Sequence, residues 1–279
     1  MDTIETGIRM IILKILETLS ILVTLVFFSL GSYYDMKARE VSDNLWMVYA
    51  PIGISLTLGR VILDPSTLLL TAISAVVTIL VAFGLFYLGL FGGADAKAIL
   101  CLGATMPLAP SSYPTIIGYV YPFFPLVVTI TSYLCSTSVI IWLGLTNLGR
   151  YISRGGRMFN GLSKESGWKK LLAFITGYPV EQAKLRSTFY LYPMEEVLET
   201  DSGPRRAFRL FVSAEEDRSE ELVKLESQLS RMGYTGEVWV TPGLPQLVFL
   251  LFAIVITLIL GDPLFGTAVK LSHYPLRLM

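Results

Sequence analysis

Six apolar segments, separated by short polar stretches, constrain this chain more than any other feature of its sequence. They cover residues 8–34, 44–63, 66–90, 95–109, 113–148 and 244–260. A helix needs about 20 predominantly apolar residues to cross the hydrocarbon core of a bilayer. Only 16% of the residues are charged, whereas about one-quarter are charged in typical soluble domains. We therefore expect a mainly α-helical membrane protein with about six transmembrane helices.

Two of the six segments are expected to be irregular, and the first is expected to be retained. The segment 95–109 is short for a full span. The segment 113–148 contains Pro114, Pro122 and Pro125, and proline removes a hydrogen bond from a helix interior and clashes with the preceding turn. We expect a break near its start and regular helix from about Phe124. The segment 8–34 is too long for the core of a signal peptide, so we interpret it as a transmembrane helix.

Charged residues concentrate between residues 150 and 241. Fourteen of the 22 lysines and arginines fall there. Within it, Leu222, Leu225 and Leu229 share one face of a predicted amphipathic helix, with Ser213 as its N-cap and Gly233 as its C-cap. Alternating strand-like patterns occupy residues 187–193, 206–212 and 236–240.

These patterns predict a small soluble α/β insert between helices five and six. The chain then divides into residues 1–149 with five transmembrane helices, a cytosolic insert at 150–241, and residues 242–279 with the last helix and a short tail. The balanced charge and the absence of a basic surface give no indication of nucleic-acid binding.

Positive charges in short loops indicate the orientation of the helices. Lys37 and Arg39 follow the first helix, and Arg150, Arg154 and Arg157 follow the fifth. Loops rich in Lys and Arg stay in the cytoplasm. The amino terminus is then outside, and the loops after helix one and before helix four face the cytoplasm.

Two aspartates lie at this face. Asp35 is expected to end helix one, and Asp95 to begin helix four, behind Gly92 and Gly93. An ionisable residue at membrane depth is costly and is a functional candidate by default. Taken singly, Asp95 could instead be the N-cap of its helix, and Asp35 an interfacial residue. The two glycines are expected to form a tight turn that lets a substrate approach.

Taken together, two close carboxylates cannot both ionise easily, so one holds a proton while the other acts as a base. Such a pair can activate water against a peptide bond. The only histidine, His273, lies in the carboxyl-terminal tail. The sequence therefore contains no HExxH zinc motif and no Ser–His arrangement within the membrane segments.

Three motifs together resemble those of the archaeal prepilin and preflagellin peptidases, polytopic aspartyl proteases of the GxGD class related to presenilin and signal peptide peptidase. They are YYDMKAREVSDNLW around Asp35, GGADAK around Asp95, and TPGLPQLVFLLFAIVITLILGDP at the last helix. One departure is Ala94, where the strict Gly-x-Gly-Asp motif has glycine. The resemblance implies that Asp35 and Asp95 are catalytic, with Gly92, Gly93 and Ala94 forming the motif loop.

The resemblance also implies a substrate and an active-site location. The substrate is the amino-terminal signal of a pilin-like or archaellin precursor, with a short basic segment, a small residue at the cut site and a long apolar helix. Cleavage takes place at the cytoplasmic membrane boundary, without cofactor or metal. Bacterial relatives also N-methylate the new amino terminus and carry a cysteine-rich loop. Nothing here resembles that loop, so we expect peptidase activity without methylation.

Several neighbouring residues have more than one interpretation. Lys37, Arg39 and Glu40 could contact substrate or support the aspartates, although juxtamembrane cations more often bind anionic lipid headgroups. Asp43 is expected to cap the second helix. Asp262, in the Gly-Asp-Pro that ends the last helix, is expected to be a surface turn residue.

The main alternative to a peptidase is a transporter, in which intramembrane carboxylates bind cations or relay protons. Transporters often contain repeated halves with broken helices, and no such repeat is visible. Cys101 and Cys135 belong to no CxxC pair and are expected to be small buried hydrophobes. We expect a multi-pass protein of the cell membrane whose partners are precursor proteins and lipids.

Overall fold

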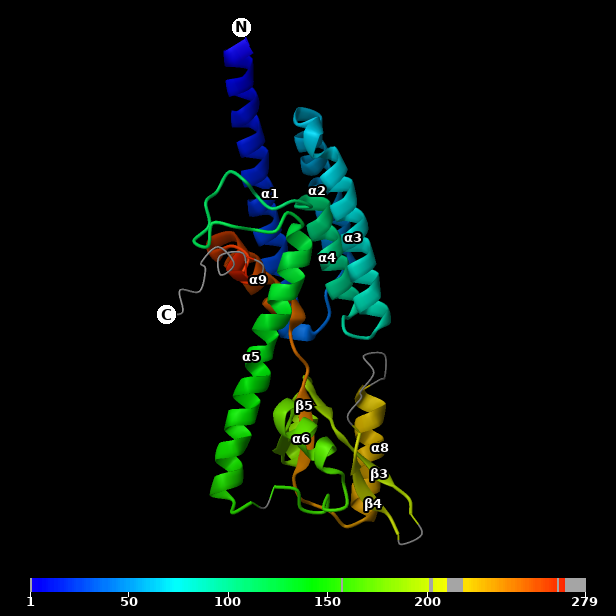
Figure 1. The fold of residues 1–279 in the computed structure, drawn as a ribbon. Coiled ribbons are helices and arrows are strands. Elements are labelled where there is room, and N and C mark those ends of the chain that lie inside the picture. Colours follow the sequence, from blue (N-terminus) through cyan, green and yellow to red (C-terminus); the bar gives the residue numbers. More distant parts are fainter. Residues whose placement is uncertain (1, 157, 201–202, 210–217, 265, 269–279) are drawn as a thin grey trace, which may run out of the picture. The chain divides into compact units, whose positions relative to one another are not determined.

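The computed structural model describes residues 2–156, 158–200, 203–209, 218–264 and 266–268 (Figure 1). The chain forms two compact units. The first comprises Met1–Ser136 with Pro245–Met279, and the second comprises Thr137–Leu244. The predicted N-cap Ser213 and the histidine His273 lie outside the described residues.

The first unit is built from helices. It contains α1 (Asp2–Ala38), α2 (Asp43–Leu63), a 3₁₀ turn η1 (Pro65–Thr67), α3 (Leu68–Tyr87), α4 (Gly93–Thr105), the first part of α5 (Phe124–Ser153) and α9 (Gln246–Leu260). Short connections make α1 to α4 alternate in direction. Helix α1 packs against α2, α4 and α9, while α2 and α3 both pack against α4 (Figure 1). The end of α1 and the start of α4 consequently lie at one end of this unit.

Four stretches are long and apolar enough to cross a membrane: Ile4–Ala38, Asp43–Leu63, Pro65–Tyr87 and Phe124–Ser153. This confirms a multi-pass, mainly helical protein. Helices α4 and α9 have 13 and 15 residues. At about 1.5 Å per residue each is about 20 Å long, shorter than the roughly 30 Å hydrocarbon core.

Helix α4 lies in the centre of the first unit. Ala98, Ile99 and Leu102 on α4 are fully buried, together with Phe28 of α1 and Leu250 of α9. A Cβ atom added at its Gly103 would come within 2.6 Å of Thr78 Cγ2 on α3. Small residues let membrane helices approach this closely, which explains why a short apolar helix can be surrounded by longer ones.

Two details of the helix boundaries bear on the predictions. Residues 106–123 form no helix and α5 begins at Phe124, which confirms the predicted break. Helix α1 continues beyond residue 34 to Ala38, so Asp35 lies inside its last turn and does not end it. Lys37 in that turn favours the extension, because cations stabilise the negative end of the helix dipole.

The second unit combines helices with two small antiparallel sheets. After the end of α5 come α6 (Gly167–Thr176), α7 (Gln182–Ser187) and α8 (Arg218–Arg231). One sheet has the order β1-β5-β2, with β1 (Tyr178–Val180), β5 (Val238–Pro242) and β2 (Leu191–Pro193). The other pairs β3 (Glu195–Leu198) with β4 (Arg205–Phe208). The second unit is therefore an α/β domain, as the sequence predicted.

Helix α8 packs as its sequence pattern predicted. Leu225 and Leu229 are buried in the core of the second unit. Gly233 has a φ of +65°, and its neighbour Tyr234 donates its amide to the Leu229 carbonyl at 3.0 Å. Gly233 is therefore the C-cap that the sequence indicated. The strands β1 and β3 were not predicted from the sequence.

Candidate active site

Asp35 projects from the last turn of α1 and is largely enclosed. Its side chain is 14% exposed and lies 3.9 Å from Arg39 Nη1 through Oδ1. The other oxygen, Oδ2, accepts the backbone N–H of Leu247 at 3.3 Å. Leu247 belongs to the first turn of α9, where backbone N–H groups have no partner inside the helix. Asp35 therefore meets both a cation and the amino-terminal end of another helix.

Asp95 lies in the first turn of α4. The N-cap of this helix is Gly92, and the Gly92 N–H donates to Asp95 Oδ2 at 3.1 Å. Asp95 is thus not the N-cap that one interpretation of the sequence suggested. It accepts the amide of the N-cap residue from its position in the first turn, where a negative charge still interacts favourably with the helix dipole.

The fold brings these two carboxyl groups into electrostatic reach of each other. Helices α1 and α4 are in contact, and the charges of Asp35 and Arg39 both act on Asp95. Within the described part of the chain, each carboxylate accepts a different backbone amide and no hydrogen bond joins the two directly. The arrangement can hold one proton on the pair, since two neighbouring carboxylates resist double ionisation.

The glycines of the motif loop have a different role from the predicted one. Gly92 has an ordinary φ of −73°, and the left-handed turn before α4 is made by Gly89, with a φ of +69°. The expectation that Gly92 and Gly93 form the turn was therefore wrong. A Cβ atom at Gly92 would lie 3.4 Å from Asp95 Oδ2, so this glycine leaves open space beside the carboxylate. Ala94 is half-buried.

The charged neighbours of Asp35 differ in what they contact. Arg39 faces the carboxylate, whereas Lys37 extends over the ring of Tyr33 at 5.8 Å and is exposed. Glu40 is exposed as well. Asp43 is the first residue of α2, whose N-cap is Ser42, so its predicted role as the cap was wrong.

Two groups beside the aspartates were not predicted. The first is the Leu247 amide. The motif TPGLPQ marks its position in the sequence, but nothing in the motif indicates a contact with Asp35. The second is Tyr133 of α5, whose ring stacks on the buried Phe91 with centroids 5.4 Å apart. Tyr133 also experiences the charge of Asp95, so α5 reaches the same site.

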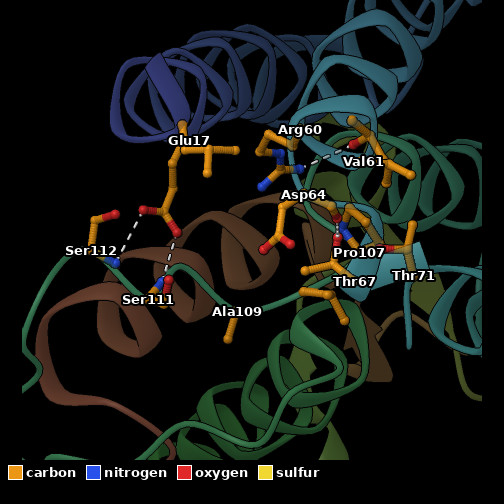
Figure 2. Close-up of a pocket in the computed structure, with 13 residues that line it drawn as sticks. Glu17, Arg60, Val61, Asp64, Thr67, Thr71, Pro107, Ala109, Ser111 and Ser112 are labelled. Atoms are coloured by element: carbon orange, nitrogen blue, oxygen red, sulfur yellow. Dashed lines mark hydrogen bonds between the residues drawn. The ribbon is translucent and has the colours of Figure 1, made fainter. Parts of the chain in front are cut away.

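A cavity of about 150 Å³, lined by both polar and apolar side chains, lies near the other ends of these helices. Figure 2 shows Glu17, Arg60 and Asp64 directed toward it. Glu17 precedes Asp35 by 18 residues of continuous helix, which corresponds to about 27 Å along α1. The cavity is therefore separate from the aspartates.

Glu17 fixes the irregular segment 106–123 to α1. Its side chain is buried and accepts the backbone N–H of Ser111 at 2.6 Å and of Ser112 at 3.1 Å (Figure 2). We expect Glu17→Ala to lower the thermal unfolding temperature in detergent and the free energy of unfolding by about 1–3 kcal/mol, because two backbone amides lose their charged acceptor. Glu17→Gln should cost less, since one acceptor oxygen remains.

The matched control for this prediction is Glu5→Ala, which removes an exposed carboxylate from the same helix. Circular dichroism melting of the three variants in one detergent provides the measurement. Equal unfolding temperatures for Glu17→Ala and Glu5→Ala would contradict a clamping role for Glu17.

Asp262 is not the surface turn residue that the sequence suggested. It is 1% exposed, donates its amide to the Tyr119 carbonyl at 3.0 Å and accepts the Leu264 amide at 3.0 Å. The segment 106–123 covers it, because Ile116 and Ile117 donate their amides to the last carbonyls of α9. Asp262 thus belongs to the packing at the end of α9.

Comparison with known proteins identifies the family. Residues 22–145, which include both aspartates, match the type IV leader peptidase family. Residues 169–263 match the archaeal peptidase A24 C-terminus of type II. The chain belongs to the type IV leader peptidase family. This confirms the resemblance found in the sequence, and members of this family are aspartic endopeptidases.

The sequence of this chain is also similar to those of individual relatives, over most of their length. The preflagellin peptidase of Methanocaldococcus jannaschii is 27% identical over 244 residues, 85% of this chain and 92% of that protein. That of Methanococcus voltae is 26% identical over 241 residues, 84% of this chain and 91% of the relative. That of Methanococcus maripaludis is 25% identical over 240 residues, with the same coverage of 84% and 91%. The sequence match therefore covers nearly the whole length of each relative.

Proposed function

We propose that this leader peptidase removes the basic amino-terminal signal from pilin-like or archaellin precursors, using a water molecule activated by Asp35 and Asp95. The observation that carries the proposal is the placement of the two carboxyl groups within electrostatic reach of each other. They come from α1 and α4, 60 positions apart in the sequence, and interact electrostatically at one end of the first unit. The three preflagellin peptidases support the choice of substrate.

The chemistry follows from two carboxyl groups that share one proton. The ionised carboxylate takes a proton from water as the water oxygen attacks the scissile carbonyl carbon. The protonated carboxyl group donates its proton to the carbonyl oxygen. Both proton transfers require groups held in the correct protonation states. The reaction needs no metal or cofactor. We further propose that the enzyme does not methylate its product, since the sequence lacks a counterpart of the cysteine-rich loop.

The aspartates are proposed to lie at the cytoplasmic boundary of the cell membrane. Lys37 and Arg39 follow α1 at this end, and positively charged loops remain cytoplasmic. The four long spans would be joined by two shorter crossings formed by α4 and α9. The division into membrane helices at 1–149, a cytosolic insert at 150–241 and a final helix at 242–279 completes this topology.

Cleavage of a synthetic precursor by the purified enzyme in detergent tests the proposal. The peptide should carry a short basic segment, a small residue at the cut site and an apolar helix. We expect cleavage at a single position. Mass spectrometry should identify an apolar fragment whose new amino terminus lies at the junction between the basic and apolar segments. A matched peptide with leucine at the cut site should be cleaved at least about tenfold more slowly, because added bulk is excluded from a fitted site. Failure to cleave any basic-apolar precursor would reject the function.

A further inference from the structure

We propose that Arg39 is a positioning residue that keeps Asp35 as the ionised carboxylate, so that Asp35 acts as the base and Asp95 as the acid. This inference depends on the proposed function, because it assigns separate roles within the same pair. It rests on the unequal surroundings of the two carboxyl groups.

Arg39 adopts an unusual backbone conformation next to Asp35. Its φ is +58°, and it is the only described residue other than glycine with a positive φ. A side chain with a Cβ atom in the left-handed region costs of order 1 kcal/mol or more, and such strain persists where surrounding contacts maintain it. Here the strained residue directly follows α1, which ends at Ala38, and its amide donates to the Asp35 carbonyl at 3.1 Å. Its guanidinium lies 3.9 Å from Asp35 Oδ1 and is 21% exposed.

A second positive influence on Asp35 comes from the start of α9. The Leu247 N–H donates to Asp35 Oδ2 at 3.3 Å, and a helix amino terminus favours negative charge. Ser32 Oγ, one turn earlier on α1, donates to the Leu247 carbonyl at 3.0 Å in a buried position. Two hydrogen bonds therefore hold the first turn of α9 against the turn that carries Asp35.

Asp95 likewise lies at a helix amino terminus, that of α4, but unlike Asp35 it has no cation as a partner in the part of the chain that the structure describes. Among the described residues it accepts one amide, that of Gly92, and forms no ion pair. The groups that face the pair are Arg39 from the end of α1, the Leu247 amide from α9 and the phenol of Tyr133 from α5. The one cation among them pairs with Asp35. The shared proton therefore resides on Asp95.

These roles give a balanced reaction. Asp35 takes a proton from water while the water oxygen bonds to the carbonyl carbon, and Asp95 gives its proton to the carbonyl oxygen. When the carbon–nitrogen bond breaks, Asp35 returns its proton to the leaving nitrogen. Asp95 recovers a proton from a hydroxyl of the tetrahedral intermediate. The pair ends with Asp35 ionised and Asp95 protonated, ready for the next turnover.

The pH dependence of kcat/KM for precursor cleavage tests this assignment. Removing the Arg39 charge makes Asp35 easier to protonate, so Arg39→Met should move the acid limb upward by about one pH unit. At a pH on the wild-type acid limb this corresponds to an additional loss of up to about tenfold. Methionine keeps a Cβ atom and a long side chain, so the backbone strain at this position is similar in both proteins. Arg39→Lys, which keeps the positive charge, should leave the acid limb close to its wild-type position.

The matched control is Lys37→Met, which removes a positive charge two residues away that faces Tyr33. Whatever it does to KM, the acid limb should stay within about 0.2 pH units of the wild type, because Lys37 does not pair with Asp35. The inference is overturned if Arg39→Met is folded and active with an unshifted limb, or if Lys37→Met shifts it equally. Either result would leave cleavage by the wild type, and hence the proposed function, intact. If Arg39→Met does not fold, Arg39→Gln, which also lacks the positive charge, provides the same test: the same upward shift is expected, and an unshifted acid limb in that variant overturns the inference.

Discussion

Replacing Asp35 or Asp95 by asparagine is expected to lower kcat/KM for precursor cleavage by about 1000-fold or more. Asparagine has almost the shape of aspartate and can still accept the Leu247 or Gly92 amide. It can neither take a proton from water nor donate a carboxylic proton to the substrate. General acid and base catalysis each contribute about 10²–10⁴ in rate, and each aspartate supplies one of them. The double variant should be at most about tenfold slower than the slower of the two single variants. The effects of replacing residues that act as a unit do not add.

The control is Asp64→Asn, which makes the same change at the end of α2, where Asp64 lies 3.8 Å from Arg9 and is partly exposed. It should retain activity within about threefold of the wild type, because exposed ion pairs contribute little. Thermal unfolding in detergent shows whether each variant is folded. A folded Asp35→Asn or Asp95→Asn variant that retains a tenth of wild-type activity would exclude the two-carboxylate mechanism.

Glu195→Ala is expected to destabilise the second unit by about 3–5 kcal/mol, because it leaves the buried Arg206 without a counter-charge. The Glu195 and Arg206 side chains are 0% and 3% exposed. Both guanidinium contacts to the carboxylate measure 2.7 Å, and Glu195 also accepts the Trp239 amide at 2.7 Å. Arg206 further donates to the Asn160 and Glu237 carbonyls. This pair therefore connects β3, β4 and β5.

Hydrogen exchange of the full-length enzyme in detergent measures this effect at the amides of the β1-β5-β2 sheet. A loss of about 3 kcal/mol corresponds to about 150-fold faster exchange by opening of the unit. Glu196→Ala, on the next residue of the same strand, should change exchange by less than about threefold, since Glu196 is only half-buried. The double replacement Glu195→Leu with Arg206→Met should recover most of the stability, because an apolar pair carries no desolvation penalty. Equal exchange in Glu195→Ala and Glu196→Ala would contradict the role of the pair.

Local features of this protein could be predicted from its sequence. The segment 44–63 became α2 at Asp43–Leu63, the segment 244–260 became α9 at Gln246–Leu260, and the prolines before Phe124 placed the start of α5. Apolar length and proline act on the chain within a few turns, so the order of residues is sufficient to predict them. The three motifs likewise indicated the family, because each is a short continuous stretch of sequence.

The contacts that give these residues their roles were decided by tertiary structure. The Leu247 amide comes from 212 positions beyond Asp35. Asp262 follows a helix end like a surface residue, yet the segment 106–123 buries it. Composition and spacing specify that helices form, but the rotation of each helix and the side chains that meet depend on close packing between distant parts of the chain.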